Sequence, residues 1–142
     1  MLFRSWQLVA KAPRDPRSHI TDASTIVAVA IAPLDSKIVY AGIRTGGIMK
    51  SSNGGDTWAA SNTGLTDKRI GSLAVDPRDP QIVYASAWDG GVFRSTDGAR
   101  SWRRFDRGLP RYPVLALAID PAGRTIFAGT GGGGVVDLRL AR

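Results

Sequence analysis

The residues 95–102, Ser-Thr-Asp-Gly-Ala-Arg-Ser-Trp, have a counterpart 44 positions earlier, at residues 51–58, which read Ser-Ser-Asn-Gly-Gly-Asp-Thr-Trp. The prolines Pro33, Pro77 and Pro121 follow one another at the same interval. A fixed period in the forties is typical of arrays of small supersecondary units. The sequence therefore predicts successive copies of one unit.

Each copy consists of short apolar runs that are separated by turns rich in glycine and proline, a pattern that predicts β-strands. In the first two copies we expect strands at residues 26–31, 37–43, 47–51, 57–61, 70–75, 81–87, 91–95 and 101–105. In the third copy we expect strands at residues 114–119, 125–129 and 135–140. The run at 26–31 is continuously apolar, so we expect that strand to be buried on both faces.

Four antiparallel strands in about 44 residues make one blade of a β-propeller. We therefore predict an all-β fold, a partial propeller of about three blades, in repeats 26–62, 70–106 and 114–140. Residues 1–25 are expected to provide an outer strand and a loop that complete a blade.

Three blades cannot close a ring, since propellers have roughly four to eight. We therefore expect either a homo-oligomer, a dimer that forms a six-bladed ring, or a chain that is part of something larger. In such a dimer, the first strand of one chain could complete the third blade of the other.

The motif Ser-x-Asp-x-Gly-x-Thr-Trp resembles the Asp-box, or bacterial neuraminidase repeat. The matching residues are Ser51, Asn53, Gly55, Thr57, Trp58, Ser95, Asp97, Ser101 and Trp102, with Ala99 in a glycine position. The third copy departs from the motif, because Asp137 lies where a box should begin. With their flanking sequences the two boxes resemble sortilin-like, xyloglucanase-like and photosystem II stability/assembly-factor-like propellers.

The resemblance implies that the boxes lie on the face away from the usual binding site and have a structural role. The short polar side chains of Asn53 and Asp97 can accept backbone N–H bonds inside a tight turn. The indoles of Trp58 and Trp102 are expected to fill the gap between neighbouring sheets.

Composition limits the chemistry. The chain has no cysteine, one histidine and 12 acidic residues, all Asp, so we expect no metal site and no cofactor. The net charge of +7 is compatible with an anionic partner. Nucleic acid is not favoured, because no nucleic-acid motif is found. We find no membrane span and no signal peptide, and expect a cytoplasmic protein if Met1 is the native start; otherwise the compartment is open.

The sequence argues against an enzyme of the sialidase type. Sialidases of the resembled family need a Tyr nucleophile with an assisting Glu, but the chain has no Glu, and Tyr40 and Tyr84 occupy equivalent repeat positions typical of packing residues. The resembled xyloglucanase-like enzymes use two Asp residues across a cleft between two propellers. One partial propeller cannot supply that cleft, although Asp67, Asp89 and Asp106 are formal candidates. We interpret Asp35, Asp76 and Asp120 as turn formers that share one repeat position.

Residues that deviate from the repeat in loops are the best candidates for binding. These candidates are Arg44, Arg69, Trp88, Asp89, Arg111 and Tyr112. We therefore expect a non-enzymatic scaffold or binding module for a protein or glycan ligand, which could dock a partner polypeptide as an assembly factor does. The alternative is a carbohydrate-active propeller, a glycoside hydrolase or glycan binder, or a fragment of one.

Overall fold

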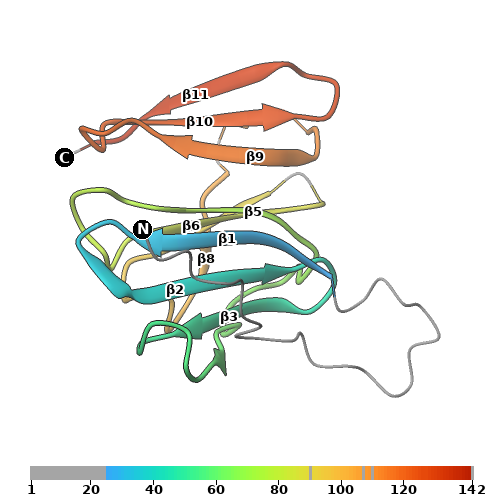
Figure 1. Ribbon diagram of the computed structural model, residues 1–142. Coiled ribbons are helices and arrows are strands. Elements are labelled where there is room, and N and C mark those ends of the chain that lie inside the picture. Colours follow the sequence, from blue (N-terminus) through green and yellow to red (C-terminus); the bar gives the residue numbers. More distant parts are fainter. Residues whose placement is uncertain (1–24, 90, 107, 110, 142) are drawn as a thin grey trace, which may run out of the picture.

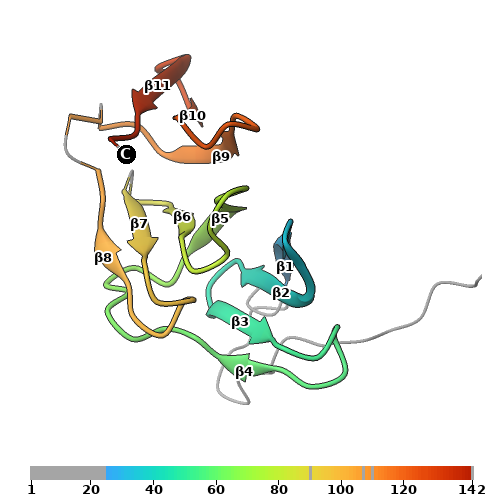
Figure 2. The ribbon, with the colours of Figure 1, turned by 90° about the vertical axis from the view of Figure 1, so that its left-hand side faces the viewer.

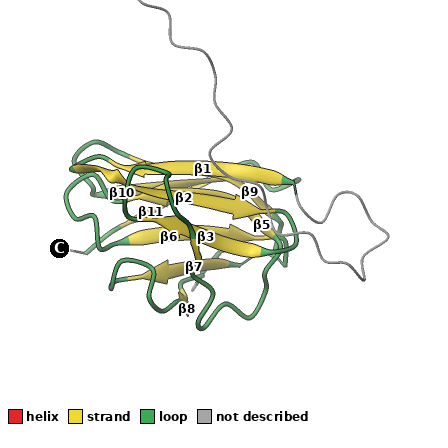
Figure 3. Cartoon of the chain, turned by 60° about the horizontal axis from the view of Figure 1, so that its bottom comes forward, coloured by secondary structure: helices red, strands yellow, loops and turns green. Residues whose placement is uncertain are grey.

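The computed structural model of the chain describes residues 25–89, 91–106, 108–109 and 111–141. Every regular element in these residues is a β-strand, so the predicted all-β class is confirmed (Figure 3). The outer strand and loop expected in residues 1–25 lie outside the described residues, apart from Thr25.

The strands follow one another as in the predicted pattern of four, four and three. They are β1 (Ile26–Ala32), β2 (Asp35–Ile43), β3 (Gly47–Ser51), β4 (Ala59–Ala60), β5 (Ile70–Val75), β6 (Val83–Ala87), β7 (Val92–Ser95), β8 (Arg103–Arg104), β9 (Val114–Ile119), β10 (Thr125–Thr130) and β11 (Val135–Arg139). The predicted bounds of β3, β5 and β9 are confirmed to the residue.

The strands form three antiparallel sheets in which neighbours in the chain are neighbours in the sheet. The first sheet has the order β1-β2-β3-β4, the second β5-β6-β7-β8 and the third β9-β10-β11. A register shift recurs near the start of each innermost strand, at Val27, Gly71 and Leu115, which are 44 residues apart. The repeat in the sequence is therefore a repeat in the backbone as well.

The second sheet lies between the other two (Figure 1). Seen from the side, the sheets fan out from the region where β1, β5 and β9 lie, and their outer strands diverge (Figure 2). This arrangement is an arc of sheets around the three innermost strands.

An apolar layer fills each gap between neighbouring sheets. Between the first and second sheets, Tyr40 and Ile48 pack against Leu73 and Val83. Between the second and third, Tyr84 and Val92 belong to a cluster with residues of β9 and β10. A fully buried Val, Ile or Leu side chain contributes about 1.5–3 kcal/mol, so these two layers are the main stabilising contacts of the arc.

The close approach of the first two sheets requires a glycine. A Cβ atom added to Gly42 in β2 would lie 2.7 Å from Cγ2 of Ile70 in β5. Such a distance is too short for two carbon atoms, so a side chain at this position would push the sheets apart.

The expectation that the strand at 26–31 is buried on both faces is wrong. Val29 is 64% and Ile31 55% exposed, because no sheet in the described part of the chain covers this face of the first sheet. A continuous apolar run indicates an inner strand but does not show whether a neighbouring sheet is present.

The outer strands β4 and β8 are shorter than predicted. The amides of Thr57 and Ser101 donate to the carboxamide of Asn53 and the carboxylate of Asp97, both at 2.9 Å, instead of pairing with a strand. Only two residues in each repeat remain for the ladder.

The prediction that Asp35 shares a repeat position with Asp76 and Asp120 is wrong. The carboxylates of Asp35 and Asp79 accept the amides of Lys37 and Gln81, so Asp35 corresponds to Asp79 and not to Asp76. All the same, Asp76 and Asp120 form turns as expected, since each accepts at least one amide from the residues that follow it.

Candidate binding site at the loop end of the sheets

The sheets have two ends of different character. One end, which we call the loop end, carries the β2–β3, β6–β7 and β10–β11 turns and the connections from β4 to β5 and from β8 to β9. The opposite end, the turn end, carries the β1–β2, β5–β6 and β9–β10 turns and the polar turns at residues 51–58 and 95–102. The candidate residues for binding come from the loop end.

The polar turn of the second sheet is held together by its own side chains. The hydroxyl of Ser95 accepts the amides of Asp97 and Ala99 at 3.3 and 2.8 Å, and donates to the Asp97 carboxylate. That carboxylate accepts both the amide and the hydroxyl of Ser101. Ala99 has a φ of 69°, which costs a residue with a Cβ about 1–2 kcal/mol, so the bonds on either side hold it in this conformation.

The turn of the first sheet repeats these bonds with an amide in place of the acid. The carboxamide oxygen of Asn53 accepts the amide of Thr57, and its nitrogen donates to the Thr57 hydroxyl at 2.7 Å. The hydroxyl of Ser51 accepts the amide of Gly55. The saturation of these polar groups within the turn leaves them few free donors and acceptors for a ligand.

The two tryptophans differ in their surroundings. Trp102 is 2% exposed and its Nε1 donates to the carbonyl of Ser61 in the first sheet's connection, which bridges two sheets as expected. Trp58 is only half-buried, and its Nε1 donates to Gly55 in its own turn. No preceding sheet is present in the described residues to meet Trp58.

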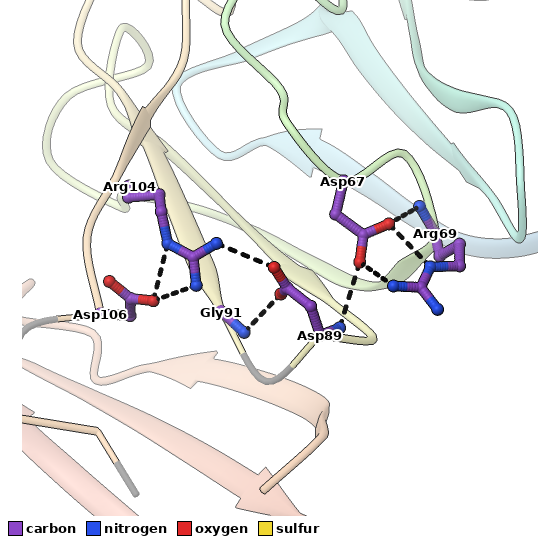
Figure 4. A network of polar contacts seen from close by, with 6 residues as sticks. All are labelled: Asp67, Arg69, Asp89, Gly91, Arg104 and Asp106. Carbon is purple, nitrogen blue, oxygen red and sulfur yellow. Dashed lines mark hydrogen bonds and ion pairs between the residues drawn. The ribbon is translucent and has the colours of Figure 1, made fainter. Parts of the chain in front are cut away.

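At the loop end, Asp67 organises the connection between β4 and β5. Its carboxylate accepts the amide of Arg69 at 2.9 Å and two guanidinium nitrogens of the same residue at 2.9 and 2.8 Å. It also accepts the amide of Asp89 at 3.1 Å, which fastens this connection to the β6–β7 turn (Figure 4). A carboxylate with these partners is positioned to hold the backbone.

A second arginine links the β6–β7 turn to the outer edge of the second sheet. Arg104 donates to Asp89 at 2.8 Å and to Asp106 at 2.9 and 2.5 Å, and Asp89 also accepts the amide of Gly91 (Figure 4). The Arg104 guanidinium lies 5.5 Å from the centre of the Phe93 ring. The network therefore pairs three carboxylates, those of Asp67, Asp89 and Asp106, with the two guanidinium groups of Arg69 and Arg104.

The pairing stabilises the ionised forms. Burial opposes ionisation of Asp67, but the hydrogen bonds and charge of Arg69, with the Asp89 amide, outweigh it and lower the pKa of Asp67. Hydrogen bonds to Asp106 and Asp89 raise the pKa of Arg104. The lowered pKa of Asp67 is the opposite of the raised pKa that a general acid needs.

Two side chains of the loop end reach into solvent beside this network. The Trp88 side chain is 46% exposed, and its amide is fixed by a 3.0 Å bond to the carbonyl of Arg69. The Arg69 side chain is 57% exposed, although one face of its guanidinium is bound to Asp67. An aromatic ring and a cation therefore lie on neighbouring, well-fixed loops.

Solved structures of similar shape make the fold plain. An ancestral GH74 enzyme matches with a TM-score of 0.68 at 24% identity, over 85% of this chain and 15% of that one. The GH74 xyloglucanase of Xanthomonas campestris matches with 0.65 at 22% identity, over 94% and 20%. YCF48 from Cyanidioschyzon merolae matches with 0.62 at 19% identity, over 90% and 36%.

The chain is a partial β-propeller. Its three sheets are blades, and the chain spans only about a fifth or less of the length of the GH74 structures it matches. No protein-family model and no curated protein sequence matches the chain. At identities below 25%, the structural matches show the fold alone.

The propeller brings some of the predicted site residues together and leaves others apart. Arg69, Trp88 and Asp89 meet at the second blade. Tyr112 lies against the glycine turn of the third blade, since a side chain at Gly133 would collide with its ring. Among the described residues, no hydrogen bond joins Tyr112 to the network of the second blade.

Arg44 and Arg111 occupy separate places at the loop end. The amide of Arg44 donates to the carbonyl of Thr25, and its Nε is buried without a hydrogen-bond partner among the described residues. The exposed side chain of Arg111 makes no ion pair with another described residue. Arg111 is thus available to an anionic group.

The sequence did not single out Arg104 as a candidate. A signal was present, because Arg104 replaces Ala60 and Asp89 replaces Thr45 at the same repeat positions. Two deviations of opposite charge in one blade indicate a pair, and the structure joins them at 2.8 Å.

The described residues were compared with the requirements of a metal site and of a membrane-spanning helix. No group of three or more His, Cys, Asp or Glu side chains there could hold a metal ion. The same residues contain no helix of the length and apolarity needed to cross a membrane.

Proposed function

We propose that this propeller arc is a non-enzymatic binding module that docks an acidic polypeptide segment at its loop end. The supporting observation is the pairing of the three loop-end carboxylates with Arg69 and Arg104, next to an exposed Trp88. The candidate acids are bonded within the network, and beside them the indole of Trp88 and the guanidinium of Arg69 are exposed to a partner.

The proposed site has the composition of a protein interface. Tryptophan, tyrosine and arginine are the residues that contribute most to binding energy at such interfaces. Trp88 and Tyr112 are both close to half exposed, and Arg111 and Lys68 are exposed. With a chain charge of +7, such a surface favours a partner segment that carries Asp or Glu beside an apolar residue.

The proposal agrees with the assembly-factor-like role that the sequence resemblance implies, and the match to YCF48 supports it no further than the fold. The second candidate is glycan binding. It is supported by the half-exposed indole of Trp88 beside the carboxylate of Asp89, since aromatic faces and carboxylates are common in ligand sites. The matched GH74 structures support it no further than the fold.

A differential selection tests the proposal. A random peptide library displayed on phage is selected on the wild-type chain after depletion on the double variant Trp88→Ala, Arg111→Ala. We expect enriched peptides with Asp or Glu next to an aromatic or aliphatic residue, and binding that weakens with salt. The single variant Arg100→Ala, which removes an exposed cation from the turn end, is the control and should bind the same peptides.

Xyloglucan oligosaccharides form the second arm of the experiment. Titration calorimetry with these sugars should give no heat of binding, and prolonged incubation should give no new reducing ends. Sugar binding that is lost in Trp88→Ala would overturn the polypeptide proposal in favour of the glycan one. A selection that returns the same peptides before and after depletion would place polypeptide binding elsewhere.

A further inference from the structure

The outer faces of the first and third blades correspond in sequence position to the two surfaces that meet where one blade packs on the next inside the arc. Tyr40 pairs with Lys50 across the strands of the first blade, and Tyr84 with Arg94 in the second, so the two tyrosines are equivalent. Both tyrosines are buried, at 0% and 1% exposure, under the blade that follows them.

In the third blade the same place belongs to Phe127, which pairs with Asp137. Phe127 is 43% exposed, and Val135, which corresponds to the buried Ile48 and Val92, is 74% exposed. The third blade therefore presents the apolar contact surface of an internal interface with no blade upon it in the described residues.

The opposite face of the arc shows the complementary half. Leu73 and Val75 of the second blade are buried against the first blade, at 7% and 8% exposure. Their equivalents one repeat earlier are Val29 and Ile31, which are 64% and 55% exposed. The open face of the first blade is thus equivalent to the surface of the second blade against which Tyr40 packs.

Two positions on the open faces carry opposite charges. Inside the arc, Lys50 donates to the carbonyl of Gly98 at 2.7 Å, next to Gln81. On the open face of the third blade, Asp137 has the position of Lys50. On the open face of the first blade, Lys37 has the position of Gln81.

The second equivalence is visible in the backbone. Gly54 donates to the carbonyl of Lys37 at 2.9 Å, as Gly98 does to that of Gln81 at 3.0 Å. A third blade set on a first blade in the internal geometry would bring Asp137 to Lys37. Where the internal contact has a cation and a neutral amide, this contact between open faces would have an ion pair.

We propose that these two faces bind each other between two copies of the chain, which then form a closed ring of six blades. The third blade of each copy packs on the first blade of the other, so the ring contains two identical contacts related by a two-fold axis. Such head-to-tail contacts close when the rotation fits and give open filaments when it does not. Six blades fall within the range of closed propellers.

The exposed apolar side chains of the two open faces favour a contact there. Val29 and Ile31 are exposed on one open face and Phe127 and Val135 on the other, and exposed apolar patches mark contact sites. A copy of the same chain is the occupant favoured here, because both halves of an interface already formed within the chain are present on it.

Light scattering after size-exclusion chromatography tests the ring. We expect a mass of twice the 15.1 kDa chain mass for the wild type. Val29→Asp and Val135→Asp should each shift the mass to that of one chain, because each places a charge in one half of the same contact. Trp88→Asp is the matched control, since it changes an exposed apolar side chain on the middle blade and should leave the mass unchanged.

A charge exchange separates the contact from a general effect on folding. Asp137→Lys should weaken association about tenfold, because two lysines would then meet. Adding Lys37→Asp to this variant should restore the wild-type dissociation constant. Circular dichroism spectra equal to that of the wild type show that the variants keep their strands.

Several results would overturn the proposal. A wild type that keeps the mass of one chain at all concentrations would mean that the two open faces do not bind each other. A dimer that dissociates with Val135→Asp but not with Val29→Asp would be a contact of like faces. A mass that grows with concentration would mean an open filament.

Discussion

Trp102 and Ser61 join the first two blades by a hydrogen bond of 2.8 Å from the indole nitrogen to the carbonyl oxygen, across 41 positions of sequence. The amide of Trp102 donates to the carbonyl of Thr63 at 2.8 Å as well. One residue at the end of the polar turn of the second blade thus fixes the connection that leaves the first. This contact couples the repeat motif to the packing of blade on blade.

We predict that Trp102→Phe lowers the free energy of unfolding by about 1 kcal/mol, because the carbonyl of Ser61 loses its partner while most of the burial remains. Trp102→Ala should cost about 3–5 kcal/mol, since it also leaves a cavity. Urea unfolding followed by circular dichroism measures both values. Trp58→Phe, in a half-buried residue that bonds within its own turn, is the control and should cost less than Trp102→Phe.

A second prediction concerns two glycines with similar backbone angles. Gly64 has a φ of +88°, and a Cβ there would lie 2.1 Å from the carbonyl oxygen of Trp102. Gly54 has a φ of +72° and nothing within 4 Å of the added atom. Gly54→Ala should cost about 1 kcal/mol for the backbone angle alone, and Gly64→Ala should cost clearly more because the first two blades must separate. Equal melting temperatures of the two variants would contradict the close packing of this junction.

The acid in the second polar turn makes stability depend on pH. Hydrogen bonds from the hydroxyl and amide of Ser101, and then from Ser95, lower the pKa of Asp97 from 3.8 to about 2. Since the pKa is lower in the folded state, the stabilisation is complete above the unfolded pKa, near 4, and is lost as the pH falls towards 2.

The variant Asp97→Asn isolates this effect, because Asn53 shows that an amide accepts the same turn amide. Between about pH 5 and pH 2, the melting temperature of the wild type should fall more steeply than that of Asp97→Asn. Parallel curves of melting temperature against pH for the two proteins would show that these hydrogen bonds do not lower the pKa of Asp97. Asp97→Ala, which accepts none of them, should melt at a lower temperature than the wild type already at neutral pH.

A fourth prediction addresses Arg104, which holds Asp89 and Asp106 on the outside of the second blade. Arg104→Lys cannot make the forked contact, so the amide of Gly91, bonded to Asp89, should exchange with solvent faster. The free energy of unfolding should change by no more than about 1 kcal/mol, because both ion pairs are partly exposed. A loss of several kcal/mol would contradict the expectation that these partly exposed ion pairs contribute little to stability.

The sequence predicts the blades because the repeat carries their physical causes. The bounds of β5 follow from six apolar or small residues between Arg69 and Asp76, and the turn at 95–102 follows from the hydrogen-bonding needs of Ser95 and Asp97. These interactions are local, within a few positions, and a single sequence displays them directly.

Other features depend on contacts that a single repeat does not encode. The runs at 26–31 and 70–75 read alike, yet Val29 is exposed and Leu73 buried, because only the second has a blade before it among the described residues. The network of Asp89 and Arg104 spans 15 positions and arises where both depart from the repeat. The binding site could be predicted as a set of unusual loop residues, but their partners required the arrangement of the blades.

The most direct test of loop-end docking is hydrogen–deuterium exchange with and without a peptide from the differential selection. We predict slower exchange at residues 67–69, 88–89 and 111–112, and no change at residues 51–58 and 95–102 of the turn end. Protection confined to the turn end, or to β1 and β10 on the open faces, would contradict docking at the loop end.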